Sequence, residues 1–199
     1  MVRATIPAAT PPHHTVHIHV HTHVHGLTLV ELLVVMALTA VVLHSATLSF
    51  SGWLQRQHLL GVSAQFNADL QWLRSAAVTR HRILRMSFQD TSAGTCYVLH
   101  SGDADACRCT ADVRAEPAVQ CADGTELLRA ALVHASRRIR LQANVTSLRV
   151  DPRHGTFTPT GSIDVSTLDG SSALRHIVNI LGRVRTCTPG PRFPGYGAC

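Results

Sequence analysis

The chain has 199 residues, of which 45% are hydrophobic and 15% are charged, and its mean hydropathy is slightly positive. This composition excludes a disordered chain and a protein with several membrane spans. All 18 basic residues are arginines, and residues 127–199 contain ten of them against three acids, a net charge of +7. Because arginine suits phosphate and carboxylate groups, a polyanionic partner is a hypothesis for this part.

The first 26 residues differ in composition from the rest of the chain. They contain one arginine, no acid, three prolines and seven histidines. Five of the histidines, from His17 to His25, occur at every second position. Alternating histidines can bind a metal along an extended segment. We favour instead a polar leader that is removed from the mature chain.

An apolar run follows from Leu27 to Leu43 and contains a single charge, Glu31. A run of about 17 residues is close to the shortest length for a helix that crosses a bilayer. A secretory signal peptide is the main alternative, but no small-residue cleavage site follows the run closely and a charge lies inside it. A carboxylate in an apolar helix is costly unless it has a partner, so we predict that Glu31 is functional.

Residues 26–31 have the sequence GLTLVE, which resembles the class III signal of type IV pilins and pseudopilins. The resemblance implies that prepilin peptidase cleaves after Gly26 and that the new N-terminus at Leu27 is methylated. It also implies a bacterial inner-membrane protein with a cytoplasmic leader and a periplasmic head, which later joins other pilins in a filament. The sequence departs from the family pattern in having Leu27 in place of phenylalanine and no basic residue near the cleavage point.

Elementary electrostatics suggests what Glu31 does in such a filament. Cleavage creates an ammonium group at Leu27, and a carboxylate four residues later on a helix lies about 6 Å along the axis. In a packed filament, Glu31 of one subunit can neutralise the amine of its neighbour, which removes two uncompensated charges from an apolar core. We therefore predict that Glu31 sets the register of assembly.

Beyond the apolar run, the hydrophobic pattern becomes amphipathic. Hydrophobic residues recur at spacings of three and four, which is typical of one buried helical stripe. The residues of this stripe are Leu59, Val62, Phe66, Leu70, Leu73 and Ala77. We predict one continuous helix over residues 27–79, of which residues 27–44 lie in the membrane or the filament core. Residues 45–80 form the amphipathic half, which packs on a folded head.

The remainder, residues 81–199, is predicted to form an extracytoplasmic head rich in β-strands. Strand patterns separated by turn signals occupy residues 83–88, 95–100, 127–133, 145–151, 155–160, 162–168 and 174–181. One long helix and many strands favour an α+β fold, in which antiparallel sheets pack on the helix. This order of elements resembles the GspH/FimT group of minor pseudopilins, so the expected architecture is the pilin fold.

The C-terminal end resembles the FimT-like branch of this group, because a GRVR sequence at residues 182–185 precedes a tail rich in glycine and proline. Members of that branch with a GRxR motif are associated with DNA binding during natural transformation. In a strand, Arg183 and Arg185 point to the same face about 6.8 Å apart, about two phosphate steps along a DNA strand. Gly182 leaves room for a close approach, and Arg175 and Arg192 extend the expected DNA-binding surface.

All six cysteines lie beyond the apolar run, on the side where the resemblance places an oxidising compartment. We predict a disulfide between Cys187 and Cys199, because the tail between them has little else to hold it. The other four are Cys96, Cys107, Cys109 and Cys121. They are expected to form two more disulfides, whose pairing the sequence leaves open. A four-thiolate zinc site is the alternative, although it lacks the usual paired CxxC spacing.

Isolated histidines and the absence of catalytic motifs such as GxSxG or HExxH predict a protein that is not an enzyme and needs no cofactor or metal. Three functional classes remain. The first is a purely structural minor pilin or pseudopilin that helps to initiate or tip a type IV pilus or type II secretion filament. The second, which we favour, adds binding of DNA without sequence preference for uptake. The third is a membrane-tethered head that binds a metal or a protein and never polymerises.

Overall fold

The computed structural model describes residues 28–110 and 118–199, with the side chains of residues 45–49 left aside. The predicted cleavage point at Gly26 and Leu27 lies outside the described residues. The chain divides into two compact units, Met1–His44 and Ser45–Cys199, and each is described by itself.

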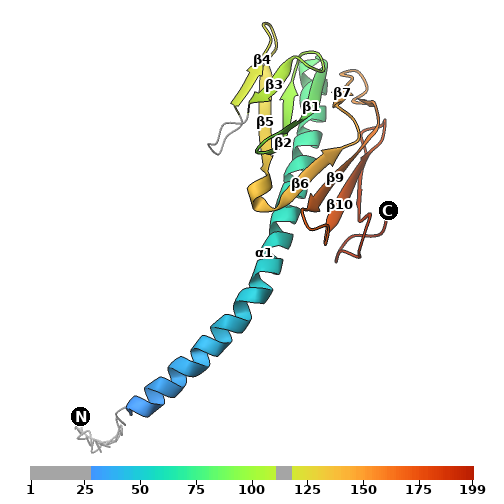
Figure 1. Ribbon diagram of the computed structural model, residues 1–199. Helices are drawn as coiled ribbons and strands as arrows, with labels where there is room; N and C mark the ends of the chain where they lie inside the picture. Colours follow the sequence, from blue (N-terminus) through green and yellow to red (C-terminus); the bar gives the residue numbers. More distant parts are fainter. Residues whose placement is uncertain (1–27, 111–117) are drawn as a thin grey trace, which may run out of the picture. The chain divides into compact units, whose positions relative to one another are not determined.

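Helix α1 spans Leu29–Arg80 (Figure 1). Both of its ends are capped. At the start, Oγ1 of Thr28 accepts a hydrogen bond of 3.2 Å from the backbone N–H of Glu31, which is one half of a capping box. At the end, His81 adopts a φ of +51°, and the N–H of Arg82 donates to the carbonyl of Ala77 at 3.2 Å. This Schellman motif stops the helix and turns the chain towards the first strand.

The helical part of the first unit is lined by large apolar side chains, from Leu29, which is 75% exposed, to Leu43, which is 66% exposed. A continuous apolar surface of this kind marks a place where a protein meets lipid or another chain. Among the residues that the structure describes, no helix is long and apolar enough to cross a membrane.

In the second unit, α1 contributes one wall of the hydrophobic core. The side chains of the predicted stripe point inward: Leu59, Phe66, Leu70, Leu73 and Ala77 are fully buried, and Val62 is partly buried. Two polar residues, Ser63 and Asp69, are also buried on α1. Buried polar groups need hydrogen-bond partners. The partners of Ser63 and Asp69 lie on the strands, so these two residues determine where the sheets pack on the helix.

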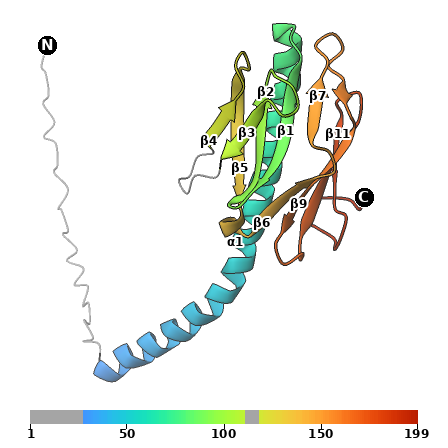
Figure 2. The ribbon, with the colours of Figure 1, turned by 45° about the horizontal axis from the view of Figure 1, so that its top comes forward.

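Two antiparallel sheets pack against α1 (Figure 2). The larger has the strand order β5-β2-β1-β7-β8 and consists of β1 (Leu84–Thr91), β2 (Gly94–His100), β5 (Leu127–His134), β7 (Ser147–Val150) and β8 (Phe157–Thr158). The smaller has the order β11-β10-β9-β6 and consists of β6 (Ile139–Ala143), β9 (Gly161–Thr167), β10 (Ala173–Val178) and β11 (Val184–Cys187). A separate pair is formed by β3 (Cys107–Thr110) and β4 (Ala118–Cys121), and a 3-10 turn (Ala135–Arg137) precedes β6.

The strands differ from the sequence-based expectation in four places. One is the strand expected over residues 155–160, of which only the two residues of β8 form a strand. The sequence did not predict β3 and β4, which are four residues long and expose alternate side chains, nor β6, whose five residues bury two. The strand expected over residues 174–181 ends at Val178, because Asn179 begins a tight turn. The α+β arrangement of one long helix on antiparallel sheets is confirmed.

The larger sheet is joined to α1 through a buried carboxylate. Asp69 accepts a hydrogen bond of 2.8 Å from the hydroxyl of Tyr97 on β2 and one of 2.9 Å from Arg129 on β5. The Arg129 guanidinium also lies 4.0 Å from the centre of the Trp72 ring, which adds a cation–π contact. Burial and the Asp69 carboxylate both raise the pKa of Tyr97 above its ordinary value, so the hydroxyl remains a donor.

The smaller sheet is joined to α1 through a buried histidine. Nε2 of His176 on β10 lies 2.8 Å from Oγ of Ser63, and Nδ1 lies 3.0 Å from Oγ1 of Thr186 on β11. The imidazole also packs at 5.3 Å against the ring of Phe66. Burial lowers the pKa of His176 to about 4, while Asp164 opposes this shift, so the ring is neutral at neutral pH.

Candidate functional site

The GRVR motif lies on the hairpin formed by β10 and β11. Val178 pairs with Val184, and the intervening turn is closed by Asn179, whose carbonyl accepts from the N–H of Gly182 at 3.0 Å. The side-chain oxygen of Asn179 accepts from the N–H of Arg183 at 2.9 Å. Gly182 has a φ of +75°, which glycine adopts without strain. Asn179 and Gly182 therefore fix the backbone of the turn that leads into Arg183 and Arg185.

Arg183 and Arg185 project from the same face of the hairpin. Both are exposed, and they alternate with Val184, which packs on the core, and Thr186, which contacts His176. Neither arginine pairs with an acid among the described residues. Arg185 donates one long hydrogen bond, of 3.5 Å, from Nη2 to the carbonyl of Ala198 in the tail. Their positive charges are therefore available to a ligand.

Arg175 lies on the neighbouring strand, but its charge is already neutralised. Its Nε and Nη2 atoms each lie 2.7 Å from a carboxylate oxygen of Asp164, which stands directly opposite on β9. This two-pronged pair raises the pKa of Arg175 further above its ordinary value. Arg175 was predicted to extend the DNA-binding surface, but together with Asp164 it adds no net charge there.

Arg192 stands on a tail that folds back onto the head. The N–H of Thr188 donates to the carbonyl of Gly197 at 2.9 Å, and a disulfide joins Cys187 to Cys199. Beside Arg192, the ring of Phe193 is buried in the main core, so the tail is anchored at its middle as well as at its ends. The exposed side chain of Arg192 is thus carried on an ordered loop.

Gly182 does not provide open space for a ligand, which corrects the role expected for it. It is buried, and a Cβ at this position would lie 2.9 Å from Nε of Arg74 on α1. Arg74 also donates from Nε to the carbonyl of Gly155 at 2.9 Å, and a Cβ on Gly155 would meet the same atom at 3.0 Å. The two glycines therefore hold Arg74 between them. The sequence did not predict this contact, because it joins a helix residue to glycines in two distant turns.

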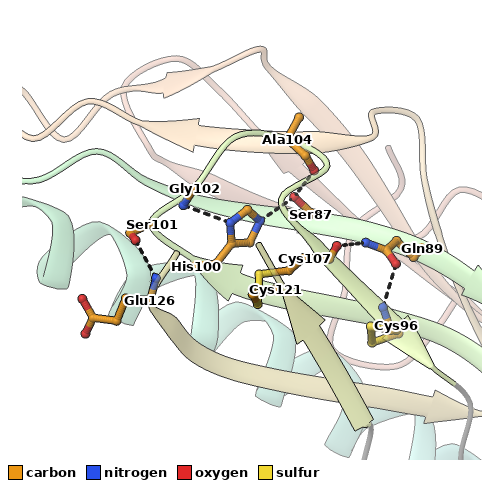
Figure 3. The surroundings of a disulfide bond; sticks show 11 residues. Ser87, Gln89, Cys96, His100, Ser101, Gly102, Ala104, Cys107, Cys121 and Glu126 are labelled. Carbon is orange, nitrogen blue, oxygen red and sulfur yellow. Dashed lines mark hydrogen bonds between the residues drawn. A yellow bond between two sulfur atoms is a disulfide. The ribbon is translucent and has the colours of Figure 1, made fainter. Parts of the chain in front are cut away.

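The other four cysteines form two disulfides near the paired strands β3 and β4. Cys96 is bonded to Cys109, and Cys107 to Cys121, which stands opposite it in the β3–β4 register. The side-chain amide of Gln89 makes two hydrogen bonds to the backbone of β3 (Figure 3). Its nitrogen donates to the carbonyl of Cys107, and its oxygen accepts from the N–H of Cys109. Because every cysteine is in a disulfide, the alternative of a four-thiolate zinc site is wrong. No group of side chains that could hold a metal occurs in residues 28–110 and 118–199.

His100 is buried beside these disulfides and is held as one tautomer (Figure 3). Its Nδ1 accepts a hydrogen bond of 3.2 Å from the N–H of Gly102, so the proton resides on Nε2, which lies 2.8 Å from Oγ of Ser87. Ser87 in turn donates to the carbonyl of Ala104 at 2.9 Å. Burial, with a contribution from Arg85, lowers the pKa of His100. The arrangement is a satisfied structural histidine.

Two family models match the chain. One, for the prokaryotic N-terminal methylation motif, matches residues 22–47 and so includes the predicted cleavage point and Glu31. The other, described as type II transport protein GspH, matches residues 63–182. A search of curated proteins found no match to this chain.

Solved structures with a similar backbone arrangement were also found. The type IV minor pilin FimU of Pseudomonas aeruginosa strain PAO1 is 17% identical, with a TM-score of 0.46 over 65% of this chain and 88% of that chain. The minor pseudopilin EpsH from the type 2 secretion system of Vibrio cholerae is 14% identical, with a TM-score of 0.45 over 65% of this chain and 97% of that chain.

The family matches agree with the prediction of a GspH-like minor pseudopilin that is not an enzyme. The match of the GspH model extends over more than half of the 199 residues. This chain therefore belongs to the GspH family of type II transport proteins.

Proposed function

We propose that the chain is a minor subunit of a type IV pilus or type II secretion filament that also binds DNA. The observation that carries the DNA-binding part is the exposed pair Arg183 and Arg185, which share one face and have no acid partner among the described residues. Arg192 adds a third charge on the ordered tail. Guanidinium groups bind phosphate oxygens in a planar, two-pronged geometry, and such contacts carry no sequence information.

Three free arginines imply modest affinity that falls steeply with salt. Each phosphate neutralised on a duplex contributes about 0.9 to the slope of log K against log salt concentration, so these contacts predict a slope of about −3. The fixed turn at Asn179 and the disulfide at Cys187 reduce the ordering that binding requires. The expected ligand is the backbone of any DNA sequence.

Fluorescence anisotropy with two short duplexes of unrelated sequence tests this proposal, with the mature full-length protein in detergent over a series of salt concentrations. The Arg183→Gln/Arg185→Gln variant should bind both duplexes more weakly and should flatten the slope by about two units. Arg108→Gln is the matched control, since Arg108 is an exposed arginine on β3, away from the hairpin. A parent protein that does not bind at low salt, or a double variant that equals the parent, would refute DNA binding.

The same proposal includes the steps before assembly. Prepilin peptidase cleaves between Gly26 and Leu27, residues 27–44 anchor the subunit in the inner membrane, and the head faces the periplasm. The methylation-motif match over residues 22–47 and the exposed apolar side chains from Leu29 to Leu43 support this order of events. In the filament, Glu31 neutralises the terminal amine of a neighbouring subunit.

A purely structural pseudopilin without DNA binding is the second candidate. The observation that favours it is the Arg175–Asp164 pair, because it removes one of the charges expected on the DNA-binding surface. Under this alternative, the arginines of β11 contact acidic groups of a neighbouring subunit. Normal filament assembly by the Arg183→Gln/Arg185→Gln variant, together with loss of DNA binding, would exclude it.

A further inference from the structure

A hollow of about 450 Å³ lies between the last turns of α1 and the turn that joins β7 to β8. Its polar side chains are those of Gln71, Arg74, Ser75 and Thr79 on the helix and of Arg153 and His154 on the turn. No acid lines it. The two arginines carry positive charge, and the Gln71 amide and the Ser75 hydroxyl can also donate hydrogen bonds to an anion. The Thr79 hydroxyl already donates to the carbonyl of Ser75 at 2.9 Å.

Arg74 is held in place at the bottom of this hollow. Its Nε donates to the carbonyl of Gly155, and the backbones of Gly155 and Gly182 enclose the same atom. These contacts use one of the five N–H groups of the guanidinium. Within the described part of the chain, the Nη atoms of Arg74 have no hydrogen-bond partner and the side chain has no acid partner. An arginine fixed through Nε offers its two remaining nitrogens to a phosphate at little entropic cost.

The turn that carries Arg153 and His154 is also fixed. One oxygen of the Asp151 carboxylate accepts from the N–H of Arg153 at 2.9 Å and from that of His154 at 3.2 Å. These hydrogen bonds lower the pKa of Asp151. Nδ1 of His154 lies 3.6 Å from the same oxygen, so Asp151 offsets part of the local charge. Arg74 and Arg153 still leave the region net positive.

The hollow and the GRVR motif meet at the tip of the β10–β11 hairpin. Arg74 touches Gly182, and the next residue along the chain is Arg183, the first of the two motif arginines. The tip is tied down, since the N–H of Phe157 donates to the carbonyl of Ile180 at 2.9 Å. The hollow is therefore next to the start of the motif, and a DNA strand that passes the tip can reach both.

We propose that this hollow is a second phosphate-binding site, which extends the DNA-binding surface from the hairpin onto α1 and the β7–β8 turn. The inference rests on the proposed DNA binding and adds residues that the motif does not contain. Arg74 and Arg153 bind one phosphate group of the backbone, and the Ser75 hydroxyl and His154 lie beside it. A polynucleotide can contact both sites at once, whereas a free phosphate ion contacts only one.

The test uses the mature full-length protein in detergent and a short DNA duplex, with binding measured across a salt series. Arg153→Gln is the main variant, because Arg153 is exposed and its backbone, not its side chain, shapes the turn. It should weaken binding and reduce the salt slope by about one unit, whereas the Arg108→Gln control should leave both unchanged. Adding Arg153→Gln to the Arg183→Gln/Arg185→Gln variant should bring the total reduction to about three units.

The outcomes separate the two proposals. If Arg183→Gln/Arg185→Gln loses affinity while Arg153→Gln behaves like Arg108→Gln, the second site is refuted and DNA binding through the hairpin stands. If the parent protein does not bind DNA at low salt, both proposals fail. Arg74→Lys provides a second measure of the site, because it keeps the charge but removes the planar fork. A thermal-unfolding midpoint equal to that of the parent, together with weaker binding, would support Arg74 as a phosphate ligand.

Discussion

Acid should destabilise the head through the buried histidine that joins the smaller sheet to α1. His176 is 1% exposed, and burial lowers its pKa in the folded protein to about 4 from the ordinary value of 6.5. As the pH falls below 6.5, the unfolded chain binds a proton at this site while the folded chain does not. Stability is therefore complete above pH 6.5 and is lost progressively until the pH reaches about 4.

The size of the effect follows from the shift in pKa. Each unit is equivalent to about 1.4 kcal/mol, so the full loss from His176 is about 3 kcal/mol, most of which accrues between about pH 7.5 and about pH 4.5. His100, whose pKa is also lowered by burial, acts in the same direction. The carboxylates of Asp151 and Asp169 have lowered pKa values, so most of their contribution is lost at lower pH.

Urea unfolding monitored by circular dichroism at the two pH values would measure this loss. His176→Gln retains an amide that can contact Ser63 but cannot titrate. It should therefore be less stable than the parent at neutral pH and should lose about 2–3 kcal/mol less on acidification. His154→Gln is the matched control, since His154 is an exposed histidine. If His176→Gln and the parent lost equal stability between the two pH values, the neutral buried histidine would be refuted.

Three further predictions concern processing, assembly and the hairpin. Gly26→Val should leave the leader attached, because the peptidase site needs a small residue there. N-terminal sequencing of membrane-extracted protein would check this, and a variant that begins at Leu27 would contradict it. Glu31→Ala should still insert in the membrane but should be largely absent from purified filaments, since the neighbour's amine loses its partner. Immunoblotting of filament and membrane fractions measures this, and normal incorporation would rule out the proposed role. Gly182→Ala should lower the free energy of unfolding by at least about 1 kcal/mol, because of its φ of +75° and the contact with Arg74. Gly190→Ala, where nothing lies within 4 Å of an added Cβ, is the control, and equal stability of the two variants would refute the argument.

The features predicted from the sequence depend on local patterns. The helical stripe from Leu59 to Ala77 repeats at three and four residues over five turns, and it needs no knowledge of its partner to be recognised. The strand β9 buries every second residue, so its alternation is also visible in the sequence. Strands β3 and β4 are too short for such a pattern, and the Cys107–Cys121 disulfide holds them together.

The parts of the site that the sequence did not predict depend on contacts between distant residues. Arg74 and Gly155 are 81 positions apart, and no spacing rule relates a helix residue to a glycine in a distant turn. Asp164 neutralises Arg175 because the register of β9 and β10 places the two side by side, and register is a property of the folded sheet. Gly182 faces Arg74 on α1, and no local pattern in the sequence predicts that contact.

The polar contacts of α1 also bear on mechanical resistance. A stripe of leucines on a helix tolerates sliding, since one apolar side chain can replace another one turn away. Asp69 and Ser63 do not, because a shift of one turn, about 5.4 Å, would separate them from Tyr97 and His176 and leave buried groups unpaired. Each group stranded in this way costs about 1–3 kcal/mol. When force is applied along α1, these two contacts therefore resist sliding and keep each sheet in register with the helix.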